Sequence, residues 1–528
     1  MPKAVIIGGG HNGLVCSYYL AKKGFDVTVY EAAGTVGGAA VTDEFSPGFR
    51  NSAASYTVSL LNPKVIADMQ LQAHGLEVVL RKIDNFLPGK GHDYLLAGRD
   101  GLTRSELVRH CAADGPAYDR YVADLEGIVA LIRKWLLRSP VEAGAGLRGL
   151  PKLLSLGKDL VGLSTNEIAK LHRFATRSAG DILDEYFEGE MAKALFGFDG
   201  IVGNFASPYQ QGTAYVLLHH LFGEVNGVEG AWGHAIGGMG AITRAMAKAA
   251  RGAGVDIVLN SKVEEVIVDR GRATGVVVGG KGVHADTVVA GVNPKLLFDQ
   301  LVPEGAVERR VERHFANWSC ESATFRMNVA LSRLPNFTAI PGRGDHLTAG
   351  IIIAPSLDYM DRAYASASLD GWSSEPVVEM LVPSTLDPTL APKGKHVASL
   401  FCQHFRYKLP NGRSWDDLRE QAADHVIATV DAYAPGFAES VIDRQIHSPL
   451  DLERRFGLVG GDIFHGKMGL DQLFSARPMI GAADYRMPLD GLYLCGSGAH
   501  PGGGITGAPG HNAARAVIAD KRKLGKVA

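Results

Sequence analysis

The chain has 528 residues, of which 46% are hydrophobic and 21% are charged, and its formal net charge is −2. This length exceeds one ordinary domain, so two sequential or interleaved domains with a large core are expected. The near-neutral charge lacks the basic excess of a nucleic-acid-binding protein, so no nucleic-acid partner is expected.

The first 31 residues predict a nucleotide-binding unit. Residues 4–7 of "AVIIGGGHNGLVCSYYLAKKGFDVTVYE" are an apolar run suited to a buried parallel strand, and residues 14–23 carry apolar side chains at helical spacing. Residues 25–31 predict a second strand that ends in an acid. The glycines interrupt the apolar run after four residues, which excludes a spanning helix here.

Gly8, Gly10 and Gly13 have the GxGxxG spacing of a dinucleotide-binding turn. The first glycine permits a tight turn, the second lets the backbone approach a pyrophosphate, and the third lets helix and strand pack closely. His11 and Asn12 open the helix, whose free N–H groups and dipole favour phosphate. Glu31 follows Gly13 by 18 residues and is placed to accept hydrogen bonds from a ribose.

Three later segments favour FAD over a nicotinamide dinucleotide. Gly37 and Gly38 allow a loop to run close to a ligand beyond the pyrophosphate. Four strands at 255–259, 263–268, 274–278 and 287–290 are expected to complete the nucleotide-binding sheet after an insertion. The C-terminal segment predicts a strand at 492–495, a turn at Gly496 and Gly498, and a helix at 510–517. This return supplies the second wall that the longer FAD molecule needs.

Four segments carry a family resemblance: "VGGAAVTDEFSPGFRNSAASYTVSLL", "IAPSLDYMDRAY", "FHGKMGLDQLFSARP" and "GLYLCGSGAHPGGGITGAPG". They resemble the bacterial relatives of pyridine nucleotide-disulphide oxidoreductase domain-containing protein 2, a group similar to phytoene desaturases and carotene isomerases and, more distantly, to amine oxidases. The resemblance implies an α/β fold with a discontinuous FAD-binding domain of glutathione-reductase type, at 1–64, 226–299 and 461–528. The inserted substrate domain, an α+β unit of sheet roofed by helices, would take 65–225 and 300–460.

The resemblance also implies roles for single residues. The first glycine turn would bind the pyrophosphate, Glu31 the adenosine ribose, and Gly37 and Gly38 the ribityl side, while the backbone of Val263 would hold adenine. Many desaturases and amine oxidases have Arg after the paired glycines, where this chain has Ala39. The flavin end would be contacted by Gly496, Gly498 and the turn at 501–506, which includes Gly504, Ile505 and Thr506.

A second GxGxxG spans 144–149 and raises the question of an NAD(P)H site. No clean strand precedes it and Pro151 follows closely, so no such site is expected. Residues 147–163 then form an amphipathic stretch with interspersed basic residues. Two interpretations are open: a helix packed on the core, which is favoured because most amphipathic helices face cores, and a helix lying on a membrane.

Proton transfer in C–H oxidation requires an acid or base, and the side chains considered are Tyr56, His220, His234, His404, His465 and His500. His500 is favoured because its turn is expected to touch the flavin, and Tyr56 is the second choice. The five cysteines are scattered and form no close pair, so neither a metal site nor a redox dithiol is expected, and a reducing compartment is favoured.

The sequence therefore predicts an FAD-dependent oxidoreductase that acts on CH–CH or C=C units of an apolar, isoprenoid or lipid-like small molecule. Two alternatives remain, an FAD-dependent amine oxidase and a flavin-binding protein whose main role is to bind a partner. The electron acceptor is open between oxygen and a quinone. The expected location is the cytoplasm, with peripheral contact to the inner face of the membrane as the variant that the amphipathic stretch raises.

Overall fold

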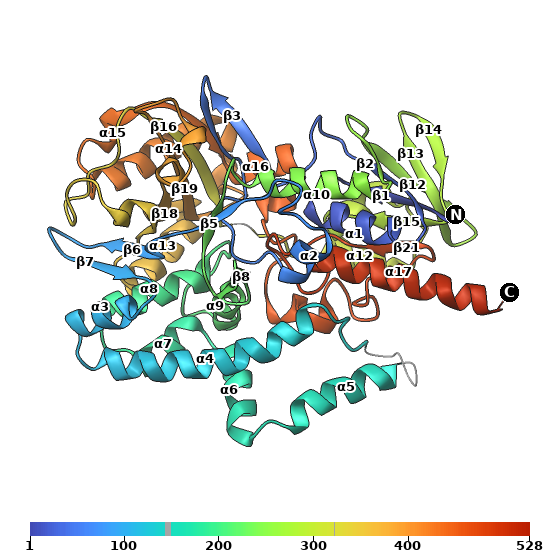
Figure 1. Cartoon of the computed structure of the whole chain (residues 1–528), viewed down its shortest axis with the longest axis horizontal. Coiled ribbons are helices and arrows are strands. Elements are labelled where there is room, and N and C mark those ends of the chain that lie inside the picture. The colour runs from blue at the N-terminus through green and yellow to red at the C-terminus, as the bar shows by residue number, and fades with distance from the viewer. Residues whose placement is uncertain (143–148, 322, 528) are drawn as a thin grey trace.

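The computed structural model describes residues 1–142, 149–321 and 323–527. Two sheets lie at opposite ends of an elongated molecule, and helices fill the space around them (Figure 1). The second GxGxxG of the sequence lies almost entirely outside the described residues. Within the described ranges, no helix combines the length and the apolar character needed to cross a bilayer.

The first sheet has five parallel strands in the order β11-β2-β1-β15-β21. Its apolar side chains are buried on both faces, which explains the continuous β-branched runs in the sequence. Helices α1, α10 and α17 run beside it, and α1 packs between the other two. The elements are β1 (Lys3–Ile7), β2 (Asp26–Tyr30), β11 (Asp256–Val258), β15 (Thr287–Ala290), β21 (Leu492–Leu494), α1 (His11–Ala21), α10 (Gly240–Gly252) and α17 (Ala508–Val527).

The predicted strands 263–268 and 274–278 do not join this sheet, contrary to expectation. They form β12 (Val263–Asp269) and β13 (Arg272–Val278), which pair antiparallel with each other and with β14 (Lys281–His284) in a separate three-stranded sheet. Arg270 and Gly271 both have positive φ, at 47° and 77°. Such a two-residue turn joins antiparallel strands, whereas parallel neighbours need a long crossover.

The second large sheet has seven strands in the order β20-β16-β19-β18-β17-β6-β7, and only β17 and β6 pair in parallel. Its two longest strands, β18 and β19, have ten residues each and pair antiparallel with each other at the centre of the sheet. The strands are β6 (Asn85–Pro88), β7 (Tyr94–Ala97), β16 (Phe325–Leu331), β17 (Gly350–Ile353), β18 (Trp372–Leu381), β19 (His396–Phe405) and β20 (Val441–His447).

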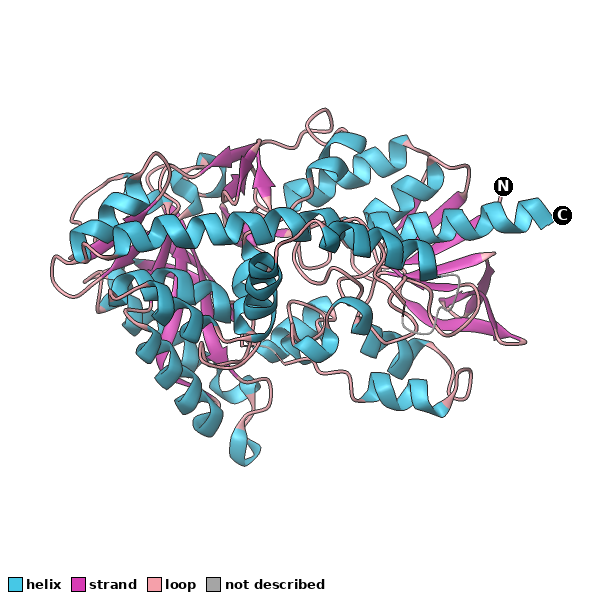
Figure 2. Cartoon of the chain, turned by 90° about the horizontal axis from the view of Figure 1, so that it is seen from below, coloured by secondary structure: helices cyan, strands magenta, loops and turns pink. Residues whose placement is uncertain are grey.

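Helices cover this second sheet and form a layer below it (Figures 1 and 2). Residues 165–186 form two helices, because the first ends at Thr176, where Arg177 is extended, and the side chain of Ser178 caps the second. The helices are α2 (Pro63–Asp68), α3 (Leu102–His110), α4 (Asp114–Leu136), α5 (Leu150–Val161), α6 (Thr165–Thr176), α7 (Ala179–Tyr186), α8 (Glu190–Ile201), α9 (Thr213–His220), α11 (Pro294–Leu296), α12 (Arg309–Ala316), α13 (Leu357–Asp370), α14 (Trp415–Asp431), α15 (Phe437–Ser440) and α16 (Pro449–Phe456).

Among the described residues, three two-stranded sheets lie between the two large sheets (Figure 1). They are β3 (Thr42–Ser46) with β4 (Phe49–Ser52), β5 (Val78–Leu80) with β10 (Gly233–Ala235), and β8 (Glu224–Val225) with β9 (Val228–Glu229). The parallel sheet draws its strands from the three segments assigned to the FAD domain, and the seven-stranded sheet draws its strands from the other two. The residue boundaries between the domains stay a prediction.

The position of helix α5 contradicts the favoured interpretation of residues 147–163 as a helix packed on the core. No residue of α5 is buried, so the helix does not pack an apolar face on the core. In Figure 1 it lies at the lower margin of the molecule, below the end of α4.

Candidate flavin site and adjoining cavity

The first glycine turn has the geometry that a dinucleotide needs. Gly8 has φ of 95°, which favours glycine, and a Cβ on Gly13 would lie 2.2 Å from the carbonyl oxygen of Gly8. Gly10 differs, because a Cβ there would meet nothing within 4 Å. Gly13 is therefore required by the packing of strand and helix, while the space beside Gly10 is open.

Other residues predicted to bind FAD gather at the same edge of the sheet. Gly37 donates its N–H to the carbonyl oxygen of Gly9 at 2.9 Å, and a Cβ on Gly38 would lie 3.4 Å from the Cα of Gly10. Glu31 accepts hydrogen bonds from the N–H groups of Gly9, at 2.6 Å, and Ala33, at 2.8 Å. The β12 strand that begins at Val263 follows this corner, because Ser261 donates to the carbonyl oxygen of Glu31.

Two polar atoms at the start of α1 support the fit of FAD. The side-chain atoms His11 Nε2 and Asn12 Oδ1 are buried and have no hydrogen-bond partner in the described protein. Burial and the neighbouring ring of His465 lower the pKa of His11 to about 3, so the imidazole is neutral and retains an N–H donor. Buried polar groups usually have partners, and because the amide oxygen of Asn12 can only accept, a ribose or ribityl hydroxyl that donates to it is a suitable one.

The C-terminal segment meets this turn as predicted, but its glycines have a different reason. Asn12 Nδ2 donates to Ser497 Oγ at 3.2 Å, which joins the two ends of the chain at one site. A Cβ on Gly496 would lie 2.8 Å from the carbonyl oxygen of Gly291, and one on Gly498 would lie 2.3 Å from Pro294. A Cβ on Gly503 would lie 2.3 Å from Phe464. Protein packing therefore requires these glycines, whatever a ligand needs.

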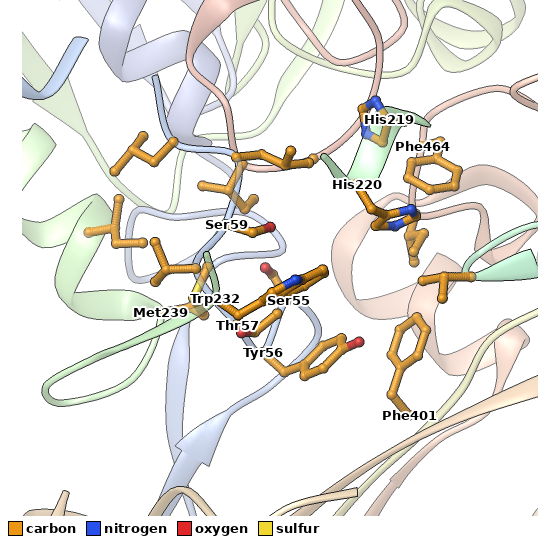
Figure 3. Close-up of a pocket in the computed structure, with 18 residues that line it drawn as sticks. Ser55, Tyr56, Thr57, Ser59, His219, His220, Trp232, Met239, Phe401 and Phe464 are labelled. Carbon is orange, nitrogen blue, oxygen red and sulfur yellow. The ribbon is translucent and has the colours of Figure 1, made fainter. Parts of the chain in front are cut away.

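A cavity of about 100 Å³ opens beside this segment (Figure 3). Gly504 and Ile505 line it from the predicted flavin segment, and His219, His220 and Phe401 line it from the segments predicted to form the substrate domain. Thr506 lies in a second, smaller cavity together with Leu60 and His219, which line both. The lining of the larger cavity is Ser55, Tyr56, Thr57, Val58, Ser59, Leu60, Leu61, Val202, His219, His220, Trp232, Met239, Ile242, Phe401, Ile463, Phe464, Gly504 and Ile505.

Tyr56 lies in this cavity and is tied to a charged cluster behind it. Its hydroxyl donates a short hydrogen bond to Glu379 Oε2, and its ring stacks on Phe401 with centroids 4.7 Å apart. The guanidinium of Arg326 lies 5.0 Å from the centroid of the Tyr56 ring. Arg81 donates to Thr57 Oγ1 at 2.6 Å and lies beside Glu379. We call Tyr56, Glu379, Arg81 and Arg326 the tyrosine cluster.

Burial dominates the electrostatics of the tyrosine cluster. It raises the pKa of Tyr56 well above its usual value, with the charge of Glu379 adding to the effect, so the phenol keeps its proton. Burial also raises the pKa of Glu379 and lowers that of Arg326 to about 10. The cluster therefore holds two guanidinium groups against one carboxylate at the edge of an apolar cavity.

Sequence reasoning missed three of these four residues. Glu379 lies within the apolar run "VVEMLVP" and Arg326 within "TFRMNVAL", and both are buried within strands, Glu379 in β18 and Arg326 in β16. A charged residue inside a buried strand is costly unless it is paired, so this pattern was the available signal. Asp199 on α8 was missed too; burial and the charge of Glu379 raise its pKa to about 8.

The structure separates the histidines considered for catalysis. His500 is buried and its Nε2 lies 3.2 Å from the carbonyl oxygen of Trp135, and it does not line the larger cavity. Its pKa falls to about 4, chiefly through burial. His220 lines the cavity and stacks near Trp232, with centroids 6.1 Å apart. Of the two residues predicted to be catalytic, the geometry favours Tyr56.

The remaining histidines have other surroundings. His234 Nε2 lies 3.4 Å from Asp387 Oδ2, His404 has no hydrogen-bond partner on either ring nitrogen in the described structure, and His465 lies near His11. Among the described residues, no group of three His, Cys, Asp or Glu side chains is arranged to hold a metal ion.

Comparison with known proteins identifies one family that matches part of the chain and several relatives that align along nearly all of it. The family described as flavin containing amine oxidoreductase matches residues 13–324. The rat (Rattus norvegicus) pyridine nucleotide-disulfide oxidoreductase domain-containing protein 2 is 39% identical over 99% of this chain and 94% of its own length. Phytoene desaturase (neurosporene-forming) from Cereibacter sphaeroides is 24% identical over 98% of this chain and 94% of its own.

The fold also has solved counterparts. Putrescine oxidase, in a structure with putrescine bound, superposes with a TM-score of 0.58 at 15% identity and covers 99% of both chains. The relatives support the group indicated by the sequence motifs. Since they include a mammalian protein, they do not narrow that group to its bacterial members.

Proposed function

Because the chain belongs to the flavin containing amine oxidoreductase family and is an FAD-dependent oxidoreductase, we propose that it oxidises a CH–CH unit of an uncharged, apolar small molecule. The observation that carries this proposal is the character of the cavity, whose lining is mostly aliphatic and aromatic. Apolar lining with a few placed polar groups is typical of small-molecule sites. Phytoene, named for one relative, is itself a hydrocarbon.

The residues that would hold FAD are those of the two glycine-rich segments. Gly8, Gly10 and Gly13 with the start of α1 would hold the pyrophosphate, and Glu31 the ribose. Bound FAD supplies a two-electron acceptor for the hydrogen and electron pair that leave one carbon of the substrate. The neighbouring carbon must then lose a proton, which leaves the C–H electron pair to form the new C=C bond.

Tyr56 and Glu379 would take this proton. Tyr56 lines the cavity and its hydroxyl already donates to Glu379, so the hydroxyl oxygen can accept a proton from the substrate while its own proton passes to Oε2. The raised pKa of Glu379 makes that carboxylate a stronger proton acceptor than an exposed one. Arg81 and Arg326 stabilise the carboxylate before the transfer.

An amine substrate, the main alternative, is disfavoured by the same cluster. The structural similarity to putrescine oxidase concerns the fold. An ammonium group would lie near two buried guanidinium groups, and like charges in a region of low dielectric repel strongly. Arg326 also lies near the rings of Tyr56 and Phe401, at 5.0 Å and 5.9 Å, which are the aromatic faces that a cation would use.

The test is anaerobic titration of the purified flavoprotein while its visible flavin absorbance is recorded. Acyclic and cyclic isoprenoid hydrocarbons and primary amines are supplied in separate experiments. Bleaching by a hydrocarbon and not by an amine supports the proposal, whereas bleaching by amines alone contradicts it. In the Tyr56→Phe variant, bleaching by the same hydrocarbon should slow by about 100-fold or more, the usual contribution of a general base.

A further inference from the structure

Helix α5 carries an apolar face that the protein leaves uncovered. Leu150, Leu153, Leu154 and Val161 are 45%, 54%, 64% and 87% exposed. The spacing i, i+3, i+4 and i+11 places all four on one side of the helix. The described residues include 12 exposed large hydrophobic side chains in all, so one helix of 12 residues holds a third of them. Single exposed apolar residues are ordinary, but a continuous face marks an interaction surface.

The opposite side of α5 is fixed to the protein by polar contacts. Asp159 accepts hydrogen bonds from Trp135 Nε1, at 3.2 Å, and from Arg138, at 2.6 Å. Lys152 donates to the carbonyl oxygen of Pro140 at 3.3 Å and lies 3.8 Å from a carboxylate oxygen of Asp484. These contacts set the rotation of the helix about its axis, so the leucines point away from the body of the protein.

We propose that this face of α5 docks on the surface of a lipid bilayer that contains anionic lipids. An amphipathic helix with this division lies in the membrane interface with its apolar side inserted. The described residues from 133 to 161 include five basic and two acidic side chains, although the formal net charge of the whole chain is −2. Three of the five bases pair with carboxylates, and Lys134 and Lys158 have no ion-pair partner among the residues described. The basic excess suits anionic head groups.

The position of α5 gives docking a consequence for the cavity. The same end of α4 that holds α5 also borders the predicted flavin segment, where Trp135 contacts His500 and Leu136 accepts a hydrogen bond from Asn512 Nδ2 at 2.9 Å. Leu136 also lines the smaller cavity together with His219. Docking would bring this border close to the bilayer, where an apolar compound concentrates. Only this consequence rests on the proposed function; the docking itself does not.

The test is co-sedimentation of the full-length flavoprotein with vesicles. One set contains equal amounts of phosphatidylcholine and phosphatidylglycerol, and the other phosphatidylcholine alone. We expect binding to the anionic vesicles, reduced about tenfold or more in the double variant Leu153→Asp with Leu154→Asp, because two inserted leucines become charged. Lys158→Glu should lower binding to the anionic vesicles several-fold and leave binding to the neutral vesicles nearly unchanged.

The matched control is Leu369→Asp, which changes a leucine that is 77% exposed on α13. It should bind as the wild type does, and all variants should keep the wild-type flavin spectrum and melting temperature because the substituted residues are exposed. Wild-type protein that stays in solution, or a double variant that binds as well as the wild type, overturns the proposal. So does a wild-type dimer that the double variant turns into a monomer, because a second copy would then cover the face. Co-sedimentation measures vesicle binding without any enzyme turnover. Its result therefore does not depend on whether the proposed substrate is correct.

Discussion

The first glycine turn and the tyrosine cluster are both polar sites, but they are built in opposite ways. The turn uses backbone geometry within six consecutive residues, Gly8 to Gly13. The tyrosine cluster uses side chains from distant segments, and the hydrogen bond between Tyr56 and Glu379 joins residues 323 positions apart. A site made of local backbone depends on which residues lack a side chain, whereas a site made of distant side chains depends on the whole fold.

The largest effect should come from Gly13→Ala, which tests the backbone site. The new Cβ would lie 2.2 Å from the carbonyl oxygen of Gly8, so strand and helix must separate. We expect a loss of about 4 kcal/mol or more in the free energy of unfolding, at the extreme of single substitutions, with little flavin retained. Thermal unfolding and flavin content of the purified protein measure both effects.

Gly10→Ala and Gly127→Ala separate packing from ligand binding. Neither Cβ would meet an atom within 4 Å, and Gly10 has φ of −69°, which alanine accepts. Gly10→Ala should keep the stability of the flavin-free protein within about 0.5 kcal/mol but lower FAD affinity. Gly127→Ala, inside α4, should lower neither. Wild-type FAD affinity in Gly10→Ala would show that the pyrophosphate lies elsewhere.

The next effect concerns the charge balance of the tyrosine cluster. Glu379→Ala leaves Arg81 and Arg326 buried without their carboxylate, which should cost about 3 kcal/mol or more in unfolding free energy. Tyr56→Phe keeps the charges and removes one hydrogen bond, so its cost should be about 1–2 kcal/mol while flavin content is retained. Denaturant unfolding of the two variants gives the comparison. Equal small losses would mean that Glu379 does not neutralise the arginines.

The contrast between the two sites also explains what the sequence could predict. The turn, the helix α1 and the position of Glu31 could be predicted, because each depends on spacing within one short segment. The seven-stranded sheet could be predicted only as separate strands, since their order depends on long-range pairing. The strands β12 and β13 were placed in the wrong sheet, although the Arg270-Gly271 turn between them favours antiparallel pairing.

Side-chain partners were the least predictable part. Tyr56 was selected by type alone, and no local pattern links it to Glu379 or Arg326. His500 was favoured because its turn was expected near the flavin, but the contact of its ring with Trp135 depends on where α4 ends. The outer face of α5 was misjudged for a similar reason, because periodicity gives the apolar side of a helix and not what lies against it.

A moderate effect should appear in the pH dependence of stability. The pKa of Asp199 is about 8 in the folded protein and near its ordinary value of about 4 in the unfolded chain. The folded state therefore binds the extra proton between these pH values, and this stabilising contribution is complete below about pH 4 and is lost as the pH rises towards 8. Asp199→Asn removes the titration. The free energy of unfolding of the variant, measured relative to the wild type, should therefore be higher at pH 8 than at pH 5 by about 1 kcal/mol or more.

Melting temperatures of the wild type and Asp199→Asn across this range measure the difference. Asp361→Asn is a control, since it makes the same change at a carboxylate on another helix, α13, which accepts a hydrogen bond from Ser207 at 2.6 Å. A difference between wild type and Asp199→Asn that does not change with pH would place the carboxyl in contact with water.

The smallest effect is expected for His500→Gln, which compares the two residues predicted to be catalytic. The carbonyl oxygen of Trp135 can only accept, so His500 Nε2 donates to it, and glutamine retains an N–H donor. Because the pKa of His500 is about 4, the imidazole is already neutral near pH 7 and changes little in charge above pH 5. We therefore expect an unfolding free energy within about 1 kcal/mol of the wild type and turnover within about threefold at every pH from 5 to 8. A positioning role for His500 would leave the shape of the pH profile unchanged. A fall of about 100-fold in kcat with KM unchanged would instead assign the proton transfer to His500, and would transfer the catalytic role from the tyrosine cluster to the C-terminal glycine segment.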